Sequence, residues 1–375
     1  MSGRVSTSQH AVANGPLAPA AESHDALPVH GGPDGGGAIA HDFSTNANPL
    51  GPPPSLLRAL AAAERGHYPD PAYTALRAAL AAWHGVAAAR VLPTAGTSEA
   101  IRRLTLAASL RGVCRVWLPR PGYGDYAAAA RALRLRVDAY DSAAQLLDVL
   151  RARAEPALVW ICEPCNPTGA SLPRAFWDDA ARAVGAFGGV LALDRAYETL
   201  RLVGSDPVPA SVAAAAWQCV SPNKSLGLTG VRAGYLLAPD DDACGLRASV
   251  AALAPSWVLA AEGEALLAAL CRPATGDWLA GARATLVDWG AQQHARLERL
   301  GWSQQASVVP FWLARPCAGQ DAAALARRLQ GLREHGIKLR DASSFGLPGW
   351  VRVSVQPPAS QCALCEAWSA MPGAV

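Results

Sequence analysis

Lysine is rare in this sequence of 375 residues, and its two copies, Lys224 and Lys338, are the side chains that could supply a reactive amine. Lys224 follows the apolar run Trp217–Val220, which we expect to be a buried strand. In an open α/β sheet, ligands bind at the carboxyl ends of the strands. Burial and neighbouring cations lower the pKa of a lysine amine, so that it can act as a base or a nucleophile. Lys224 is therefore the leading candidate for a reactive side chain.

Polar groups also follow other apolar runs. Asp194 ends the run 190–193, with Tyr197 three residues later, and Asn166 follows the run 157–162. The segment 94–99 opens a helix with small residues and hydroxyls, and accessible N–H groups at a helix start suit a phosphate. A strand-end lysine, a strand-end carboxylate and a phosphate cradle are together what pyridoxal phosphate requires. Each feature alone is more often a helix cap, a turn or a solvated charge.

Six motifs occur in a fixed order along the chain. They are Tyr68-Pro69-Asp70-Pro71, Ala95-Gly96-Thr97-Ser98-Glu99, Pro121-Gly122-Tyr123, Asn166-Pro167-Thr168-Gly169, Asp194-Arg195-Ala196-Tyr197, and the segment 221–235 with Ser221, Lys224, Gly230, Arg232, Gly234 and Tyr235. This order resembles the fold-type-I pyridoxal-phosphate enzymes, in the branch of histidinol-phosphate aminotransferase and threonine-phosphate decarboxylase. The resemblance covers about residues 30 to 356.

The resemblance implies a role for each residue that matches a motif. Lys224 would form the Schiff base with pyridoxal 5'-phosphate and carry the proton at the substrate's Cα. Asp194 would pair with the pyridine nitrogen of the cofactor. Asn166 and Tyr197 would hydrogen-bond the ring oxygen O3′, and Tyr123 would stack on the ring face.

Anionic groups of cofactor and substrate would be bound by other residues. Four residues would hold the cofactor phosphate: Gly96, Thr97, Ser221 and Arg232. Tyr68 matches a tyrosine that the family lends to the phosphate of the neighbouring subunit, which implies a homodimer with shared active sites. Arg352 would bind the substrate carboxylate through two parallel hydrogen bonds. Three positions depart from the family pattern and weaken the substrate assignment: Arg195, Leu200 and Asn223.

The flanking segments favour one reaction of this branch. Segments 30–32, 42–53 and 340–346 resemble threonine-phosphate decarboxylase, which implies decarboxylation of L-threonine O-3-phosphate to (R)-1-aminopropan-2-yl phosphate in cobalamin biosynthesis. The alternative is an aminotransferase of the histidinol-phosphate type, because Arg352 could serve either reaction. Both substrates are phosphorylated amino acids or amino alcohols. Four residues are candidate ligands of the substrate: His30, Ser44, Asn46 and Arg340. The asparagines could instead merely shape an N-terminal arm.

Apolar runs alternate with helical patterns from residue 55 to about 240, which predicts a mostly parallel sheet covered on both faces. The expected strands are 91–92, 113–118, 157–162, 190–193, Trp217–Val220 and 235–238, and the expected helices include 98–110, 126–133 and 173–187. After residue 250 the pattern predicts a smaller α+β domain. We expect a disordered tail (1–29), an N-terminal arm (30–54), a large α/β domain (55–250) and a small domain (251–375).

Composition excludes several other classes. Lys plus Arg is 33 and Asp plus Glu is 30, and a net charge of +3 argues against nucleic acid as a partner. The apolar stretch 246–271 contains Arg247, Pro255, Glu262 and Glu264, which predicts core helices and no membrane span. No secretory signal is visible at the start, so we expect a cytoplasmic protein.

The nine cysteines are an odd number scattered over a long chain, which indicates reduced thiols in place of a disulfide framework. Two pairs, Cys162 with Cys165 and Cys362 with Cys365, have the spacing of a zinc or redox motif. The pairs lie much further apart than zinc motifs usually do, so we expect no metal.

Overall fold

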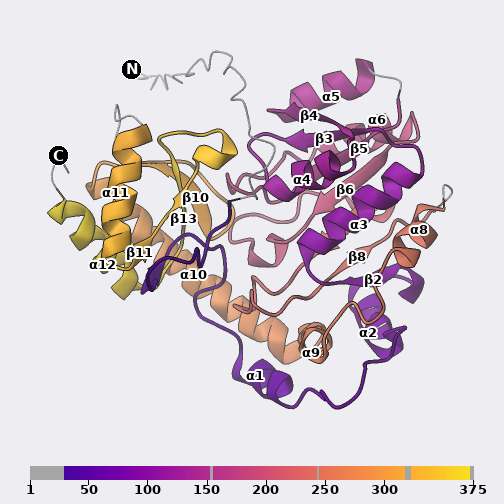
Figure 1. Ribbon diagram of the computed structural model, residues 1–375, viewed down its shortest axis with the longest axis horizontal. Helices are drawn as coiled ribbons and strands as arrows, with labels where there is room; N and C mark the ends of the chain where they lie inside the picture. Colours follow the sequence, from indigo (N-terminus) through magenta and orange to yellow (C-terminus); the bar gives the residue numbers. More distant parts are fainter. Residues whose placement is uncertain (1–28, 153–154, 243–244, 317–321, 372–375) are drawn as a thin grey trace, which may run out of the picture.

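The computed structural model describes residues 29–152, 155–242, 245–316 and 322–371. Most of the predicted tail, residues 1–28, lies outside the described residues. The centre of the molecule is a seven-stranded sheet with the strand order β2-β8-β7-β6-β5-β3-β4 (Figure 1). Its strands are β2 (Val91–Thr94), β3 (Arg115–Pro119), β4 (Arg136–Tyr140), β5 (Leu158–Cys162), β6 (Val190–Asp194), β7 (Trp217–Val220) and β8 (Gly234–Leu237).

The sheet is mostly parallel, as the buried apolar runs predicted. Strands β3 to β7 pair in parallel, whereas β8 runs antiparallel to both of its neighbours, β7 and β2. Strand β2 therefore points the same way as β7. The carboxyl ends of β2, β5, β6 and β7 consequently meet at one edge of the sheet, where the predicted site residues begin.

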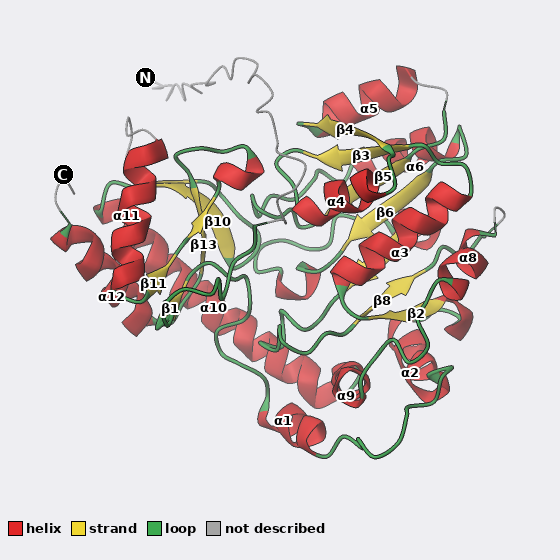
Figure 2. Cartoon of the chain, viewed as in Figure 1, coloured by secondary structure: helices red, strands yellow, loops and turns green. Residues whose placement is uncertain are grey.

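Helices cover both faces of this sheet, because alternate residues of each strand point to opposite sides (Figure 2). On β5, Leu158 and Trp160 pack with one cluster, and Val159 and Ile161 pack with another. The first cluster includes α3 (Thr97–Leu110), α4 (Gly124–Ala132) and α8 (Leu246–Ala252). The second includes α5 (Ala143–Ala152), α6 (Phe176–Gly185) and α7 (Ala210–Ala215). A third cluster joins β2 and β8 to α1 (Pro54–Ala61), α2 (Thr74–His84) and α9 (Ala261–Leu270).

A smaller antiparallel sheet lies beside the large one, with the order β12-β13-β10-β9 (Figure 1). Its strands are β9 (Ser303–Gln304), β10 (Phe311–Arg315), β12 (Arg340–Asp341) and β13 (Val351–Ser354). Three helices share its core: α10 (Pro273–Arg299), α11 (Ala322–Glu334) and α12 (Pro358–Ala370). This second layered unit has the α+β character expected after residue 250, although the exact domain boundaries stay a prediction.

The N-terminal arm is attached to the smaller unit. Strand β1 (His41–Asp42) pairs in parallel with β11 (Ile337–Lys338), and Phe43 packs into the core of that unit. The arm then leads to the edge of the large sheet at Asn48, whose backbone N–H donates to the Lys224 carbonyl at 2.9 Å. Among the described helices, none combines the length and apolar character needed to cross a membrane.

Candidate active site

A cavity of about 230 Å³ lies at the carboxyl ends of the large sheet, between it and the small sheet. Twelve of the residues singled out in the sequence line it: His30, Ser44, Asn46, Thr97, Tyr123, Asn166, Tyr197, Ser221, Lys224, Arg232, Arg340 and Arg352. They come from the arm, from the ends of β2, β3, β5, β6 and β7 and the start of β8 in the large sheet, and from two strands of the small one. Gly96 and Asp194 lie next to this wall, whereas Tyr68 lies elsewhere.

Lys224 follows β7 and is enclosed by the cavity wall. Its Nζ lies 5.2 Å from the centroid of the Tyr197 ring. Burial lowers the pKa of this amine, and the positive charges of Arg232 and Arg352 lower it further, while Asp194 acts in the opposite direction. A lysine in these surroundings can lose and regain a proton more readily than one in water.

Asp194 is the last residue of β6 and is 3 % exposed. Its Oδ2 accepts a hydrogen bond from the Tyr126 hydroxyl at 2.7 Å, and its Oδ1 accepts one from the Ala196 N–H at 3.0 Å. Burial raises the pKa of this carboxyl group, and the charge of Lys224 opposes that rise. A buried carboxylate held in this way can stabilise a protonated ring nitrogen beside it.

The start of helix α3 forms an anion cradle. Gly96 precedes the helix with φ 89° and ψ 176°, a conformation that favours glycine. A Cβ added there would lie 2.7 Å from Nη2 of Arg232, so the missing side chain leaves the cradle open. The Thr97 hydroxyl is buried, and no residue of the described chain hydrogen-bonds it. An unpartnered hydroxyl, a helix N-terminus and a guanidinium group together fit a phosphate.

Two arginines stand side by side in the small sheet, because Arg340 on β12 pairs directly with Arg352 on β13. Arg352 donates from Nη1 to Asn166 Oδ1 and from Nη2 to the Ser44 carbonyl, both at 2.6 Å. Arg340 donates from Nη2 to the Val29 carbonyl at 2.7 Å. Burial lowers the pKa of Arg352 to about 10 and also lowers that of Arg340. Two partly desolvated cations so close together favour an anionic ligand.

The three arm residues His30, Ser44 and Asn46 differ in how many polar atoms remain available to a ligand. The Ser44 hydroxyl donates to Asp42 Oδ1 at 2.6 Å and accepts from the Gly32 N–H at 2.8 Å, so it is already occupied. Asn46 donates to the Tyr197 hydroxyl at 3.2 Å, and its Oδ1 is buried without a partner among the described residues. His30 is half exposed, 5.7 Å from the Tyr123 ring centroid to centroid. Asn46 and His30 are thus better placed than Ser44 to meet a ligand.

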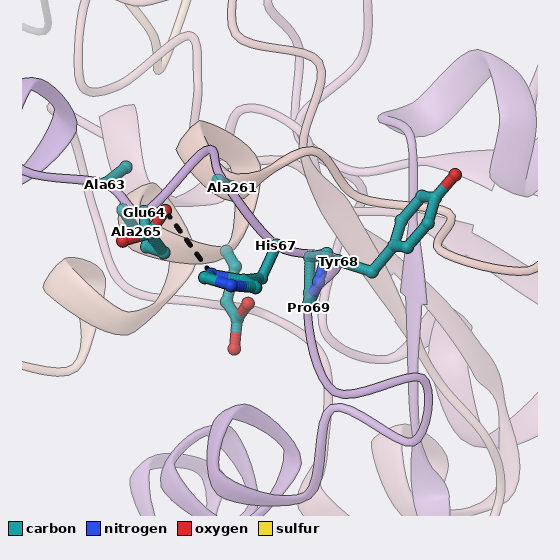
Figure 3. A pocket seen from close by; sticks show the side chains of 8 residues that line it. Ala63, Glu64, His67, Tyr68, Pro69, Ala261 and Ala265 are labelled. Atoms are coloured by element: carbon teal, nitrogen blue, oxygen red, sulfur yellow. Dashed lines mark ion pairs between the residues drawn. The ribbon is translucent and has the colours of Figure 1, made fainter.

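Tyr68 is not brought to this cavity within one chain. It is 77 % exposed and stacks on Trp257, with ring centroids 4.2 Å apart. A second hollow of about 280 Å³ lies beside it, lined by His67, Pro69 and neighbouring residues. Figure 3 shows the Tyr68 ring pointing away from the other labelled residues of that hollow. Within the described chain, Tyr68 therefore does not line the candidate site.

The sequence analysis assigned no role in the site to some of the residues found there. The cavity is also lined by Ser98, Asn223, Thr229 and Phe345, and Tyr126 supports Asp194 from outside the lining. Ser98 is adjacent in sequence to Thr97, and Asn223 is adjacent to Lys224. Their positions inside recognised motifs could therefore have predicted that they line the site. Arg195, which departs from the family pattern, does not line the cavity and forms an ion pair with Asp206.

The cysteine pairs serve no metal site that the described residues display. Among the described residues, no group of three or more His, Cys, Asp or Glu side chains is placed to hold a metal ion. Cys162 lies at the end of β5, where its sulfur accepts a hydrogen bond from the Asn166 N–H at 3.4 Å. Cys362 and Cys365 lie on α12 in the smaller unit.

Comparison with known proteins decides the family. The family described as aminotransferase class I and II matches residues 39–367. This chain belongs to that family. As in other fold-type-I enzymes, its cofactor is pyridoxal phosphate, which agrees with the cradle at Gly96 and Thr97 and with the buried Lys224 and Asp194.

Relatives of this aminotransferase-family chain carry two kinds of name. A histidinol-phosphate aminotransferase of Thermobifida fusca is 29% identical over 87% of this chain and 88% of its own length. One from Granulibacter bethesdensis is 31% identical over 84% of each chain. The solved structure of L-threonine-O-3-phosphate decarboxylase from Porphyromonas gingivalis is 25% identical, covers 87% of this chain and 98% of its own, and has a TM-score of 0.71. A histidinol-phosphate aminotransferase structure from Sinorhizobium meliloti, in complex with pyridoxal-5'-phosphate, has a TM-score of 0.75 at 23% identity and covers 90% of both chains.

Proposed function

We propose that this chain is an aminotransferase for a phosphorylated amino compound of the histidinol-phosphate type. One observation carries the choice of a phosphorylated amino compound: the cavity joins Lys224 to two adjacent guanidinium groups, those of Arg340 and Arg352. The names of the relatives support transamination, whereas the flanking segments of the sequence favoured decarboxylation. Transamination is therefore the first candidate and decarboxylation the second.

The fit of the cradle supports a set of roles toward the cofactor. When bound, pyridoxal phosphate supplies an electron sink for a bond that breaks at the substrate's Cα. The phosphate would be held by Gly96, Thr97, Ser221 and Arg232. The ring would be held by Asp194 at its nitrogen, by Asn166 and Tyr197 at its oxygen and by Tyr123 at its face. The buried Thr97 hydroxyl gains a partner in this arrangement, which the described chain does not give it.

The remaining residues act on the substrate. Lys224, with its lowered pKa, would take the proton from Cα and move it away from that carbon, as transamination requires. Arg340 would bind the phosphate of the amino compound, and Arg352 would bind the carboxylate of the keto acid through its planar fork of donors, because histidinol phosphate has no carboxylate. Each anchor would orient the bonds at Cα of its own substrate. His30 and the free oxygen of Asn46 close the cavity on the arm side, where they help to exclude water.

Decarboxylation of L-threonine O-3-phosphate is the second candidate. The structural neighbour from Porphyromonas gingivalis supports it, as do the arm and late segments. A small molecule that carries both a carboxylate and a phosphate also suits two arginines on neighbouring strands. If this reaction is the true one, a place in cobalamin biosynthesis follows.

One pair of assays separates the two reactions. The holoenzyme is incubated with L-histidinol phosphate and 2-oxoglutarate, and glutamate is measured, with histidinol as the control that lacks phosphate. In parallel it is incubated with L-threonine O-3-phosphate without a keto acid, and carbon dioxide is measured. Repeated glutamate formation supports the proposal. Repeated release of carbon dioxide, with no glutamate in the first assay, overturns it in favour of the second candidate.

The expected homodimer and cytoplasmic location belong to this proposal as well. The exposure of Tyr68 supports a partner subunit, because its ring has no role in the cavity of its own chain. The many cysteines described as free thiols are compatible with a reducing compartment.

A further inference from the structure

Tyr126 is a fully buried side chain that touches the candidate site without lining its cavity. Its ring stacks on Trp160, with centroids 5.1 Å apart and planes at 16°, and meets Tyr123 edge-on at 5.7 Å. Packing on two sides fixes the ring. The hydroxyl is thereby aimed at Asp194 Oδ2, to which it donates at 2.7 Å.

One turn of helix α4 sets this arrangement. Tyr123 directly precedes the helix and Tyr126 lies in its first turn, and their rings meet edge-on. Tyr123 lines the cavity, while Tyr126 reaches the carboxylate at the end of β6. The start of one helix therefore places both Tyr123 and Tyr126.

Several groups act on the protonation of Asp194. Burial raises its pKa and the like charge of Asp125 adds to the rise, whereas Lys224, the Tyr126 hydroxyl and the Ala196 N–H lower it. Three further titratable groups face it from neighbouring strands and loops: Cys162, Cys219 and Tyr197. In the described chain, the direct hydrogen bonds to this carboxylate come from Tyr126 and Ala196. The Tyr126 hydroxyl is the one of these two that substitution can remove cleanly.

We propose that Tyr126 is a positioning residue for cofactor binding, whose hydroxyl holds the Asp194 carboxyl group in one orientation. The Ala196 N–H fixes one oxygen and the phenol fixes the other, so neither can rotate away from the ring nitrogen. This inference rests on the cofactor and on the proposed role of Asp194. It does not depend on which reaction the enzyme catalyses.

Tyr126→Phe tests the proposal, because it keeps the packed ring and removes the hydroxyl alone. Tyr140→Phe is a matched control: Tyr140 is also buried, and its hydroxyl donates at 2.8 Å to the carbonyl of the same Trp160, away from Asp194. Both holoenzymes are studied without substrate. Two quantities are measured: the dissociation constant of pyridoxal phosphate, and the acid-side midpoint of its bound absorbance against pH. Melting temperatures check that both variants fold.

We expect Tyr126→Phe to weaken cofactor binding about tenfold and to raise the acid-side midpoint by about one pH unit. The direction follows because the hydroxyl stabilises the ionised carboxylate, so its loss lets Asp194 take a proton at a higher pH. Tyr140→Phe leaves both quantities at the wild-type values, even where it lowers the melting temperature. If Tyr126→Phe matches Tyr140→Phe in both quantities, Tyr126 only fills space and the proposal is wrong. Failure of either substrate assay leaves this comparison unaffected.

Discussion

Burial shifts the pKa values of both Lys224 and Asp194. Burial lowers the pKa of the amine, so more of it is neutral and able to accept a proton. Burial alone would also neutralise the carboxyl group, but the charge of Lys224 and two donated hydrogen bonds oppose this. The same desolvation therefore favours the neutral amine of Lys224 and disfavours the ionised form of Asp194, and the partners of Asp194 oppose that second effect.

Replacement of Lys224 by alanine separates the reactive amine from the rest of the cavity. We expect activity to fall by at least about 10²- to 10⁴-fold, since general-base catalysis is lost. The visible absorbance that depends on the lysine should disappear as well. Lys338→Ala is the matched control, because Lys338 pairs with Asp34 at 2.6 Å and does not line the cavity. Substantial activity in Lys224→Ala protein would remove Lys224 from the mechanism.

The two arginines should separate by the anion that each binds. In Arg340→Gln protein, kcat/KM for histidinol phosphate should fall about 10- to 100-fold more than for histidinol, because only the phosphate loses its cation. In Arg352→Gln protein, kcat/KM should change by the same factor for histidinol phosphate and for histidinol. The larger fall in kcat/KM should be seen for the keto acid. Steady-state kinetics with each substrate check this. An equal loss for both amines in Arg340→Gln protein would place the phosphate elsewhere.

At the scale of elements, the passage from β2 to α3 depends on Gly96. Alanine there must adopt a conformation that costs about 1–3 kcal/mol, and its Cβ would lie 2.7 Å from the Arg232 guanidinium. We therefore expect Gly96→Ala to lower the melting temperature and to weaken cofactor binding by tenfold or more. Gly112→Ala, just past the other end of α3, has φ 90° and open space around it. Gly112→Ala should lower the melting temperature and leave cofactor binding unchanged. If the two variants bind the cofactor with equal affinity, the segment at Gly96 does not hold the cofactor phosphate.

Apolar runs predicted the strands that are buried on both faces, such as β5 and β6, because burial leaves a continuous signal. Strand β4 was missed: it lies at the sheet edge, pairs only with β3 and carries Arg136 and Asp138 among partly exposed positions. Helix α5 beside it was missed too. The reversed direction of β8 was also beyond prediction, because an apolar run records burial and says nothing about direction.

In the candidate site too, local sequence motifs predicted some residues, whereas others depend on contacts between residues far apart in the chain. Motif spacing predicted residues that follow strands, such as Asn166 and Lys224, and the structure places them on one cavity. Tyr126 was missed because its partner Asp194 is 68 residues away, and no local pattern records that contact. The occupied state of the Ser44 hydroxyl also depends on a tertiary contact, to the Gly32 N–H.

At the scale of the whole molecule, one chain leaves an aromatic pair in solvent. Tyr68 is 77 % exposed and Trp257 is 41 % exposed, although they stack on each other. Trp257 also donates from its indole N–H to the Pro69 carbonyl at 3.1 Å, which holds the pair beside the Tyr68 backbone. A second copy of the chain could bind this aromatic pair at a low cost in side-chain entropy, because the two rings are already ordered.

Mixed subunits test whether Tyr68 completes the cavity of a partner. Tyr68→Ala and Lys224→Ala proteins should each have low activity, because every site lacks one of the two residues. In a hybrid dimer, one site lacks both residues, and the other combines Lys224 of one chain with Tyr68 of its partner. Random reassortment of equal amounts makes about half of the dimers hybrids, so activity should recover to about a quarter of wild type. If Tyr68 acted within its own chain, each hybrid site would keep a single defect, and mixing would restore nothing.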